Sequence, residues 1–372
     1  MPATASVDQR TDRHRRTSYD RRKCMLTIGS RKRSGRIRWP SRGRNMAATN
    51  SLDRQKTIES QLEAEDYSTL HRLATAGEHR LVVSLGGGST AGLCGNIALI
   101  HLLEELELKQ HISELWGTSA GAIVGGSWTT GTTAAEMLAT IRNLDSKDTV
   151  DLCHVAILRS LLLRPFGRFL PDGLIQGRRL ALLIDAGLKV KDFQSCTIPF
   201  RCIACSDDGR NRRKVFRKGL LLPAILSSMS LPGILAPRPA LEGEECGYYD
   251  GGLVEKTPLI SPIAEHLRSG DKRKLLLIAT HFSGDERRKP AHGFIHRFVQ
   301  SIYALEEALW GYQLKEARQR YRDKVTLLLL NPHIVEPTLF DFSHVTEHYL
   351  RARENFKHKL RNGSLALTFG AD

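Results

Sequence analysis

Three short glycine-containing motifs in this sequence carry residue types that can do acyl chemistry. GTSAG at 117–121 presents the hydroxyl of Ser119 between small residues. GGGSTAG at 86–92 is a glycine-rich turn, whose backbone N–H groups can hold an anion. DGG at 250–252 supplies the carboxylate of Asp250. A serine nucleophile and a group of N–H donors are parts that ester hydrolysis uses, and a carboxylate beside two glycines can project into a cleft from a tight turn.

Two strand-to-helix turns are predicted to position the first two motifs. A short apolar run at 81–85 stops at the glycine-rich turn, and helical spacing of apolar residues follows over 93–108. A second short strand is predicted at 112–116, where it enters the GTSAG turn, and a small-residue helix follows it at 122–127. This rhythm is typical of a parallel sheet, in which neighbouring strands bring their carboxyl-end turns together.

The remainder of the chain continues the pattern. Further strands are predicted at 200–205, 274–279 and 325–330, and further helices at 178–186, 294–318 and 344–358. The sequence therefore predicts an α/β protein with a mainly parallel central sheet.

The ordered motifs resemble the patatin-like phospholipase family over about 80–351. Besides the glycine-rich loop and the GTSAG turn, SSMSLPGILAP at 227–237 is similar to the small-residue segment that precedes the family's catalytic aspartate. YDGGL at 249–253 then resembles the aspartate motif itself. The resemblance implies a three-layer α/β/α fold and a Ser119–Asp250 dyad without histidine.

This resemblance also implies an activity: hydrolysis of carboxylic esters of lipids or phospholipids, without a metal or another cofactor. Asp250 would act as the base for Ser119, and its burial is expected to raise its pKa. The implied oxyanion-binding residues are Gly86, Gly87, Gly88 and Ser89. The implied motif glycines are Gly92, Gly117, Gly121, Gly251 and Gly252.

Two positions depart from the family pattern. Many members have a basic residue where this chain has Ala91, so a charged contribution near the glycine-rich loop is missing. Members often have Asn where Lys256 stands, which puts local contacts after the aspartate motif in doubt. Neither departure touches the implied dyad.

The residues also allow two other interpretations. An α/β-hydrolase triad could use Ser119, Asp250 and His281, because this chain order matches that class and His281 follows a predicted strand. Alternatively, the loop 86–92 could bind a nucleotide, since it satisfies a loose dinucleotide fingerprint. That second site would need an acidic residue about twenty positions later, where Glu105 and Glu107 lie on a predicted helix.

The basic charge of the chain is concentrated at its start. The formal net charge is +15, but residues 1–45 contain 14 Lys and Arg against 3 Asp, which leaves only +4 for the rest. The folded body is therefore not expected to bind nucleic acid. The tail is predicted to contact anionic membrane peripherally, although Met25 and Met46 also allow a later translation start. The seven scattered cysteines are typical of reduced thiols, so a cytoplasmic location is expected.

Four segments are predicted along the chain. Residues 1–45 form a disordered basic tail, and 46–79 form a helical lead-in. Residues 80–335 form the catalytic domain. Residues 336–372 form a C-terminal helical segment that packs on it.

Overall fold

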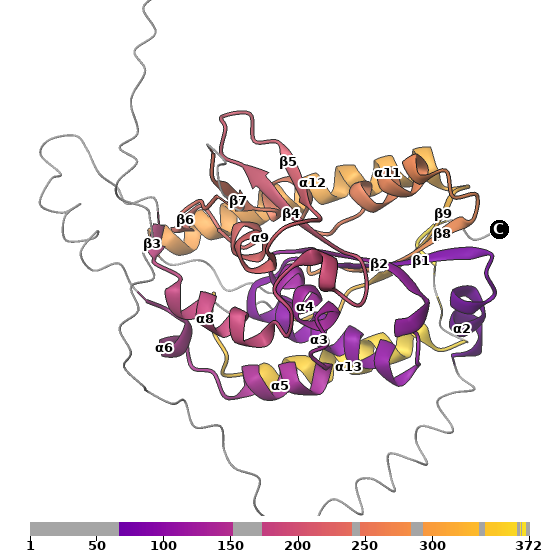
Figure 1. Ribbon diagram of the computed structural model, residues 1–372, viewed down its shortest axis with the longest axis horizontal. Helices are drawn as coiled ribbons and strands as arrows, with labels where there is room; N and C mark the ends of the chain where they lie inside the picture. The colour runs from indigo at the N-terminus through magenta and orange to yellow at the C-terminus, as the bar shows by residue number, and fades with distance from the viewer. Residues whose placement is uncertain are drawn as a thin grey trace, which may run out of the picture. The chain divides into compact units, whose positions relative to one another are not determined.

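The two strand–turn–helix units with the glycine motifs lie side by side in the computed structural model of the chain (Figure 1). Strands β1 (His79–Leu85) and β2 (Ile112–Thr118) are parallel neighbours, with Leu85 in register with Gly117. The turns that follow them therefore meet at one edge of the sheet, as predicted. The structure describes residues 67–151, 173–239, 246–283, 293–334, 339–362, 365 and 367–369, without the side chains of 294–296.

Within these residues, seven strands form one mixed sheet in the order β5-β4-β2-β1-β8-β9, with β7 also paired to β4. The other strands of this sheet are β4 (Phe200–Ser206), β5 (Arg213–Phe216), β7 (Tyr248–Asp250), β8 (Lys274–Thr280) and β9 (Val325–Leu330). Only β5 and β7 run antiparallel to their neighbour. A separate parallel pair joins β3 (Gly173–Ile175) to β6 (Gly233–Leu235).

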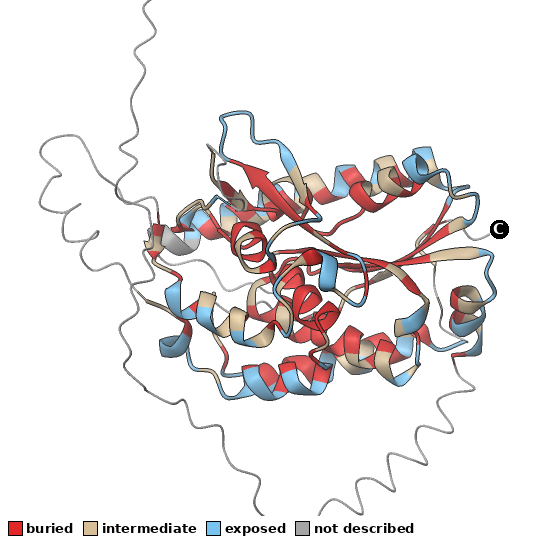
Figure 2. Ribbon diagram, viewed as in Figure 1, coloured by how far each residue is buried: buried red, intermediate tan, exposed pale blue. Residues whose placement is uncertain are grey.

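Strict alternation along the central strands produces two hydrophobic layers. Leu81, Val83 and Leu85 of β1 join the core on one face, whereas Val82 joins the core on the other. Figure 2 shows these strands buried between helices that are exposed on their outer sides. Burial on both faces explains why β1 and β8 consist mainly of apolar residues, whereas β2 also contains Ser113 and Glu114.

Helices cover both faces and complete three layers (Figure 1). On one side lie α11 (Ile260–Ser269) and the long α12 (Phe294–Tyr321). On the other side lie α3 (Ser89–Glu105), α4 (Ala120–Thr129), α5 (Ala134–Arg142), α8 (Arg178–Gly187) and α13 (Val345–Leu360). Shorter elements are α2 (Ser68–Thr75), η1 (Lys109–His111), α6 (Ser146–Thr149), η3 (Phe193–Ser195), α9 (Leu221–Ser228) and α10 (Gly252–Glu255).

The predicted α/β/α fold with a mainly parallel sheet is confirmed. No helix in the described part of the chain is both long and apolar enough to cross a membrane. The predicted basic tail, 1–45, lies outside the described residues. The domain boundaries at 46, 80 and 336 stay predictions.

Candidate active site

Ser119 lies on a sharp turn between β2 and α4. Its backbone has φ 53° and ψ −118°, a conformation that side-chain-bearing residues rarely adopt. The turn fits closely against β1, because a Cβ added to Gly121 would lie 2.0 Å from the carbonyl oxygen of Leu85. The strain exposes the hydroxyl at the N-terminus of α4, where the helix dipole favours negative charge.

This strained backbone leads to a stability prediction. The Ser119→Gly variant should be more stable than Ser119→Ala by about 1 kcal/mol, because glycine relieves a strain of about 1–3 kcal/mol at a smaller entropic cost. Urea unfolding of the two variants measures the difference.

Ser301 provides the matched control, since it lies at an exposed position inside α12. There the order should reverse, with Ser301→Ala more stable than Ser301→Gly by about 1 kcal/mol. The same order at both positions would show that the Ser119 turn is not strained.

Asp250 ends strand β7 and is 5% exposed. Burial raises the pKa of its carboxyl group from 3.8 to about 6. Interactions with the Gly252 N–H, the Ser119 side chain and the nearby charge of Lys256 lower this pKa, but by less than burial raises it. The Gly252 N–H donates to Asp250 Oδ1 at 2.7 Å. A buried carboxylate with a pKa near neutrality that lies next to a serine hydroxyl can accept that serine's proton.

The end of α9 and the segment that follows it support the turns of both residues. The Ser119 N–H donates to Ser228 Oγ at 2.9 Å, and Ser228 Oγ donates to the Ile203 carbonyl at 2.5 Å. The Asp250 N–H donates to the Ser230 carbonyl at 2.9 Å. Sequence analysis identified this segment only as a motif that precedes Asp250, and its own role is to hold Ser119 and Asp250 together.

The glycine-rich loop has two engaged and two available N–H groups at the site. The Gly86 N–H donates to Thr280 Oγ1 at 3.0 Å, and the Gly87 N–H donates to the Lys256 carbonyl at 2.9 Å. Gly87 also lies close to the serine turn, because an added Cβ would be 3.2 Å from Ser119 Cβ. The N–H groups of Gly88 and Ser89 donate to no group among the described residues. Helix α3 begins at Ser89, four residues earlier than the predicted helix, so these two groups form its N-terminus.

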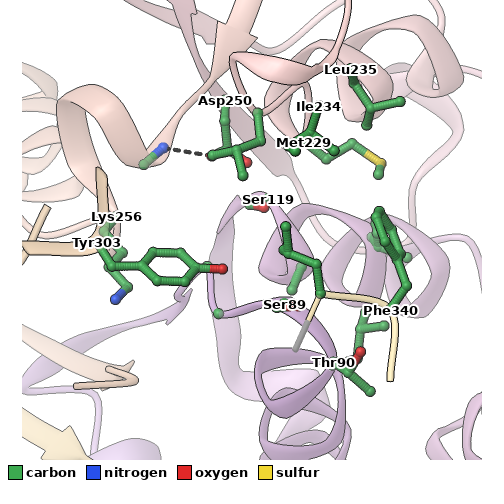
Figure 3. Close-up of a pocket in the computed structure, with 18 of the residues that line it drawn as sticks. Ser89, Thr90, Ser119, Met229, Ile234, Leu235, Asp250, Lys256, Tyr303 and Phe340 are labelled. Atoms are coloured by element: carbon green, nitrogen blue, oxygen red, sulfur yellow. Dashed lines mark hydrogen bonds between the residues drawn. The ribbon is translucent and has the colours of Figure 1, made fainter. Parts of the chain in front are cut away.

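A mainly apolar pocket of about 90 Å³ opens beside Ser119 (Figure 3). In Figure 3, Asp250 lies next to Ser119, while Met229 and Ile234 lie on the opposite side of the pocket from Tyr303. The remaining apolar lining comes from Leu93, Ile123, Leu180, Leu231, Leu235, Leu339, Phe340 and Phe342. The arrangement suits a substrate with an acyl chain attached to a reactive carbonyl.

Lys256 lines the same pocket and is only 2% exposed. Its Nζ pairs with Glu307 Oε1 at 2.7 Å and lies 3.9 Å from Glu306 Oε2. Glu306 also lines the pocket. The sequence signalled Lys256 only as a departure from the family pattern. Glu306 and Glu307 lie in the long helix α12, where nothing in the sequence distinguishes them from other polar residues.

His281 does not reach Ser119. Its Nδ1 lies 3.0 Å from Thr257 Oγ1, its Nε2 lies 3.2 Å from Glu307 Oε2, and its ring stacks on Trp310. Both ring nitrogens are thus engaged elsewhere, which favours the dyad over the triad.

Of the two acidic residues considered for a nucleotide ribose, Glu105 ends α3 and is engaged too, whereas Glu107 lies beyond the end of that helix. Both carboxylate oxygens of Glu105 accept hydrogen bonds from Arg353, at 2.6 and 2.8 Å. No group of three or more His, Cys, Asp and Glu within the described residues is arranged to hold a metal ion.

The mainly parallel sheet and the strained turn at Ser119 define an α/β protein with a serine at a strand-to-helix turn. Residues 83–263 match the sequence model of the patatin-like phospholipase family, which confirms the predicted resemblance to that family. A Caenorhabditis elegans protein named for a patatin-like phospholipase domain is 26% identical over 249 residues. That match covers 66% of this chain and 20% of the relative, so the chain spans about a fifth of the relative's length.

The chain also matches solved structures from two bacteria at low similarity. VipD of Legionella pneumophila is 11% identical, with a TM-score of 0.35, over 75% of this chain and 66% of that chain. ExoU of Pseudomonas aeruginosa, solved in complex with SpcU, is 14% identical, with a TM-score of 0.35, over 76% of this chain and 52% of that chain.

Proposed function

We propose that this chain is a lipid acyl hydrolase that cleaves carboxylic esters of lipids or phospholipids through a Ser119–Asp250 dyad. The observation that carries the proposal is the placement of Ser119 next to the buried Asp250 in the lining of one mainly apolar pocket (Figure 3). The family match supports the same class of substrate.

In the first half of the reaction, Ser119 Oγ attacks the ester carbonyl carbon while Asp250 accepts the hydroxyl proton. The carbonyl oxygen becomes an oxyanion. The N–H groups of Gly88 and Ser89 are the proposed donors to it, because those of Gly86 and Gly87 already hold the loop in place. Loss of one such donor typically lowers the rate by about 10²–10³.

Collapse of the tetrahedral intermediate breaks the bond to the alcohol, which takes the proton from Asp250 and leaves. An acyl group then remains on Ser119 Oγ. Asp250, ionised again, takes a proton from a water molecule that attacks this acyl group. The second collapse releases the fatty acid and returns the proton to Ser119.

The raised pKa of Asp250 predicts the pH dependence of the reaction. Only the ionised carboxylate accepts the Ser119 proton, so kcat/KM should fall as pH decreases through about 6. Initial rates on a soluble chromogenic ester across the acid range measure this limb. The nearby charge of Lys256 lowers the pKa of Asp250, so in Lys256→Met the limb should move to higher pH.

The matched control for this shift is Lys359→Met, which removes a lysine charge on α13. Its profile should coincide with the wild-type profile. A wild-type plateau that extends well below about pH 5 would contradict Asp250 as the base.

Labelling with a fluorophosphonate tests the nucleophile itself. The probe should form one adduct, mapped by peptide mass spectrometry to Ser119, and Ser119→Ala should form none. No adduct on a well-folded sample would refute the proposed dyad.

The basic tail is proposed to draw the enzyme to anionic lipid, at about 1 kcal/mol per basic residue near the surface. Deletion of 1–45 should then remove a salt-sensitive part of the binding to phosphatidylserine vesicles. Binding of the intact chain that does not respond to salt would argue against this role.

A further inference from the structure

A second cavity, of about 230 Å³, lies between the sheet and α11. It shares no lining residue with the pocket beside Ser119. Four arginines line it, contributed by β4, β5, the residue following β5 and α11: Arg201, Arg213, Arg217 and Arg268. Such a concentration of guanidinium groups in one concave site is a feature of anion recognition.

The inner wall of this cavity is short of negative charge. Glu114 is the shared partner of two arginines, Arg80 at 3.1 Å and Arg201 at 3.3 Å. Arg201 is only 17% exposed in its side chain, and its Nε has no hydrogen-bond partner among the described residues. A buried guanidinium N–H without an acceptor is costly, so an acceptor from a ligand would be favourable there.

The more exposed side of the cavity also has two arginines for one carboxylate. Glu265 is the shared partner of Arg217 at 3.5 Å and Arg268 at 2.9 Å. The two arginine side chains are 59% and 70% exposed, so they can turn onto a ligand without repacking the core.

Arg213 also lines the cavity, and it pairs with Glu255 at 2.7 Å. Around the cavity, then, the described residues place five guanidinium groups against three carboxylates, which leaves two positive charges in excess.

We propose that this cavity binds a phosphate group with two negative charges, either as inorganic phosphate or as a phosphomonoester. A dianion matches the excess charge, and its tetrahedral oxygens can accept paired N–H donors from several guanidinium groups. Because Arg201, Arg217 and Arg268 all line this cavity, they would contact one ligand together. Binding does not depend on the chemistry of Ser119.

Thermal unfolding of the full chain tests the proposal, with inorganic phosphate added at constant ionic strength. A ligand that binds only the folded state raises Tm in a saturable way. The double variant Arg217→Ala/Arg268→Ala should bind phosphate at least about tenfold more weakly. Glu265→Gln should bind it more tightly, because this change removes the carboxylate that competes for both arginines.

The matched control is Arg320→Ala/Arg351→Ala, which removes two exposed arginines that also pair with a glutamate one helical turn away. Its response to phosphate should equal that of the wild type. The absence of a saturable rise in the wild type, or an equal rise in Arg217→Ala/Arg268→Ala, would overturn the proposal.

Vesicles separate the two sources of phosphate. Phosphatidylcholine vesicles with and without phosphatidic acid are sedimented with the wild type and with both double variants, all of which keep the same tail. A phosphatidic acid dependence that is lost only in Arg217→Ala/Arg268→Ala assigns the site to a lipid headgroup. A phosphate effect on Tm without this dependence assigns it to a soluble phosphate or phosphate ester.

Discussion

Asp250→Asn is expected to lower kcat for ester hydrolysis by about 10²–10⁴, the usual contribution of a general base. The amide can still accept the hydrogen bond from the Gly252 N–H, but it cannot take a proton from Ser119. Steady-state rates on a soluble ester measure the loss. A kcat within about threefold of wild type would remove Asp250 from the mechanism.

Stability should change in the opposite direction to activity. Because burial raises the pKa of Asp250 from 3.8 to about 6, the folded chain binds this proton more tightly than the unfolded chain does. Ionised Asp250 therefore disfavours folding increasingly as pH rises through about 6, and the cost is complete near pH 7. Asp250→Asn removes this cost, so its Tm at neutral pH should be at least that of the wild type. A variant that lost activity by misfolding would show a lower Tm.

His281→Gln is the control that separates the dyad from a triad. Its partners are Thr257 and Glu307, so its replacement should cause a modest loss of kcat, far smaller than that of Asp250→Asn. Near-complete loss in a folded His281→Gln protein would favour the triad.

Glu255→Ala is expected to reduce the free energy of unfolding by about 3–5 kcal/mol, the largest effect on stability that we predict. Glu255 is fully buried, and its carboxylate accepts hydrogen bonds from the N–H groups of Leu259 and Ser261, from Ser261 Oγ and from Arg213. Alanine would leave these donors without an acceptor inside the protein. Urea unfolding monitored by circular dichroism measures the change.

Glu316→Ala is the matched control, because it also removes a glutamate from an ion pair with an arginine, Arg320. That pair is exposed and one helical turn apart, so the loss should be about 0.3–0.5 kcal/mol. Equal losses in the two variants would mean that the contacts of Glu255 contribute little to stability.

The parts of the fold that sequence analysis predicted are those with strong periodicity. Strands β1, β8 and β9 are buried on both faces and consist mainly of apolar residues, and turns bound them; β2 is buried too but also contains Ser113 and Glu114. Strand β7 spans only Tyr248–Asp250, and β5 is partly exposed, so neither has a run long enough to detect. Their antiparallel direction comes from pairing with β4, which is a property of tertiary structure.

The same limit applies to the site. Ser119 and Asp250 were predicted because glycines flank them in motifs with a recognisable order. Lys256 and Glu306 belong to the site through packing of α12 against α10, and nothing in their spacing indicates this. The sequence also could not predict that the Gly87 N–H donates a hydrogen bond within the protein, because its acceptor, the Lys256 carbonyl, lies far along the chain.

The pairing of β7 with β4 has a consequence for protein synthesis. Ser119 emerges from the ribosome long before Asp250, and the pocket-lining residues of α12 emerge later still. Because long-range strand pairing closes a large loop, it forms more slowly than local structure. A nascent or partly refolded chain would therefore hold a serine without its base, and recovery of fluorophosphonate labelling during refolding would report completion of the tertiary fold. The order of residues along the chain would thus keep the serine inactive until the enzyme has folded.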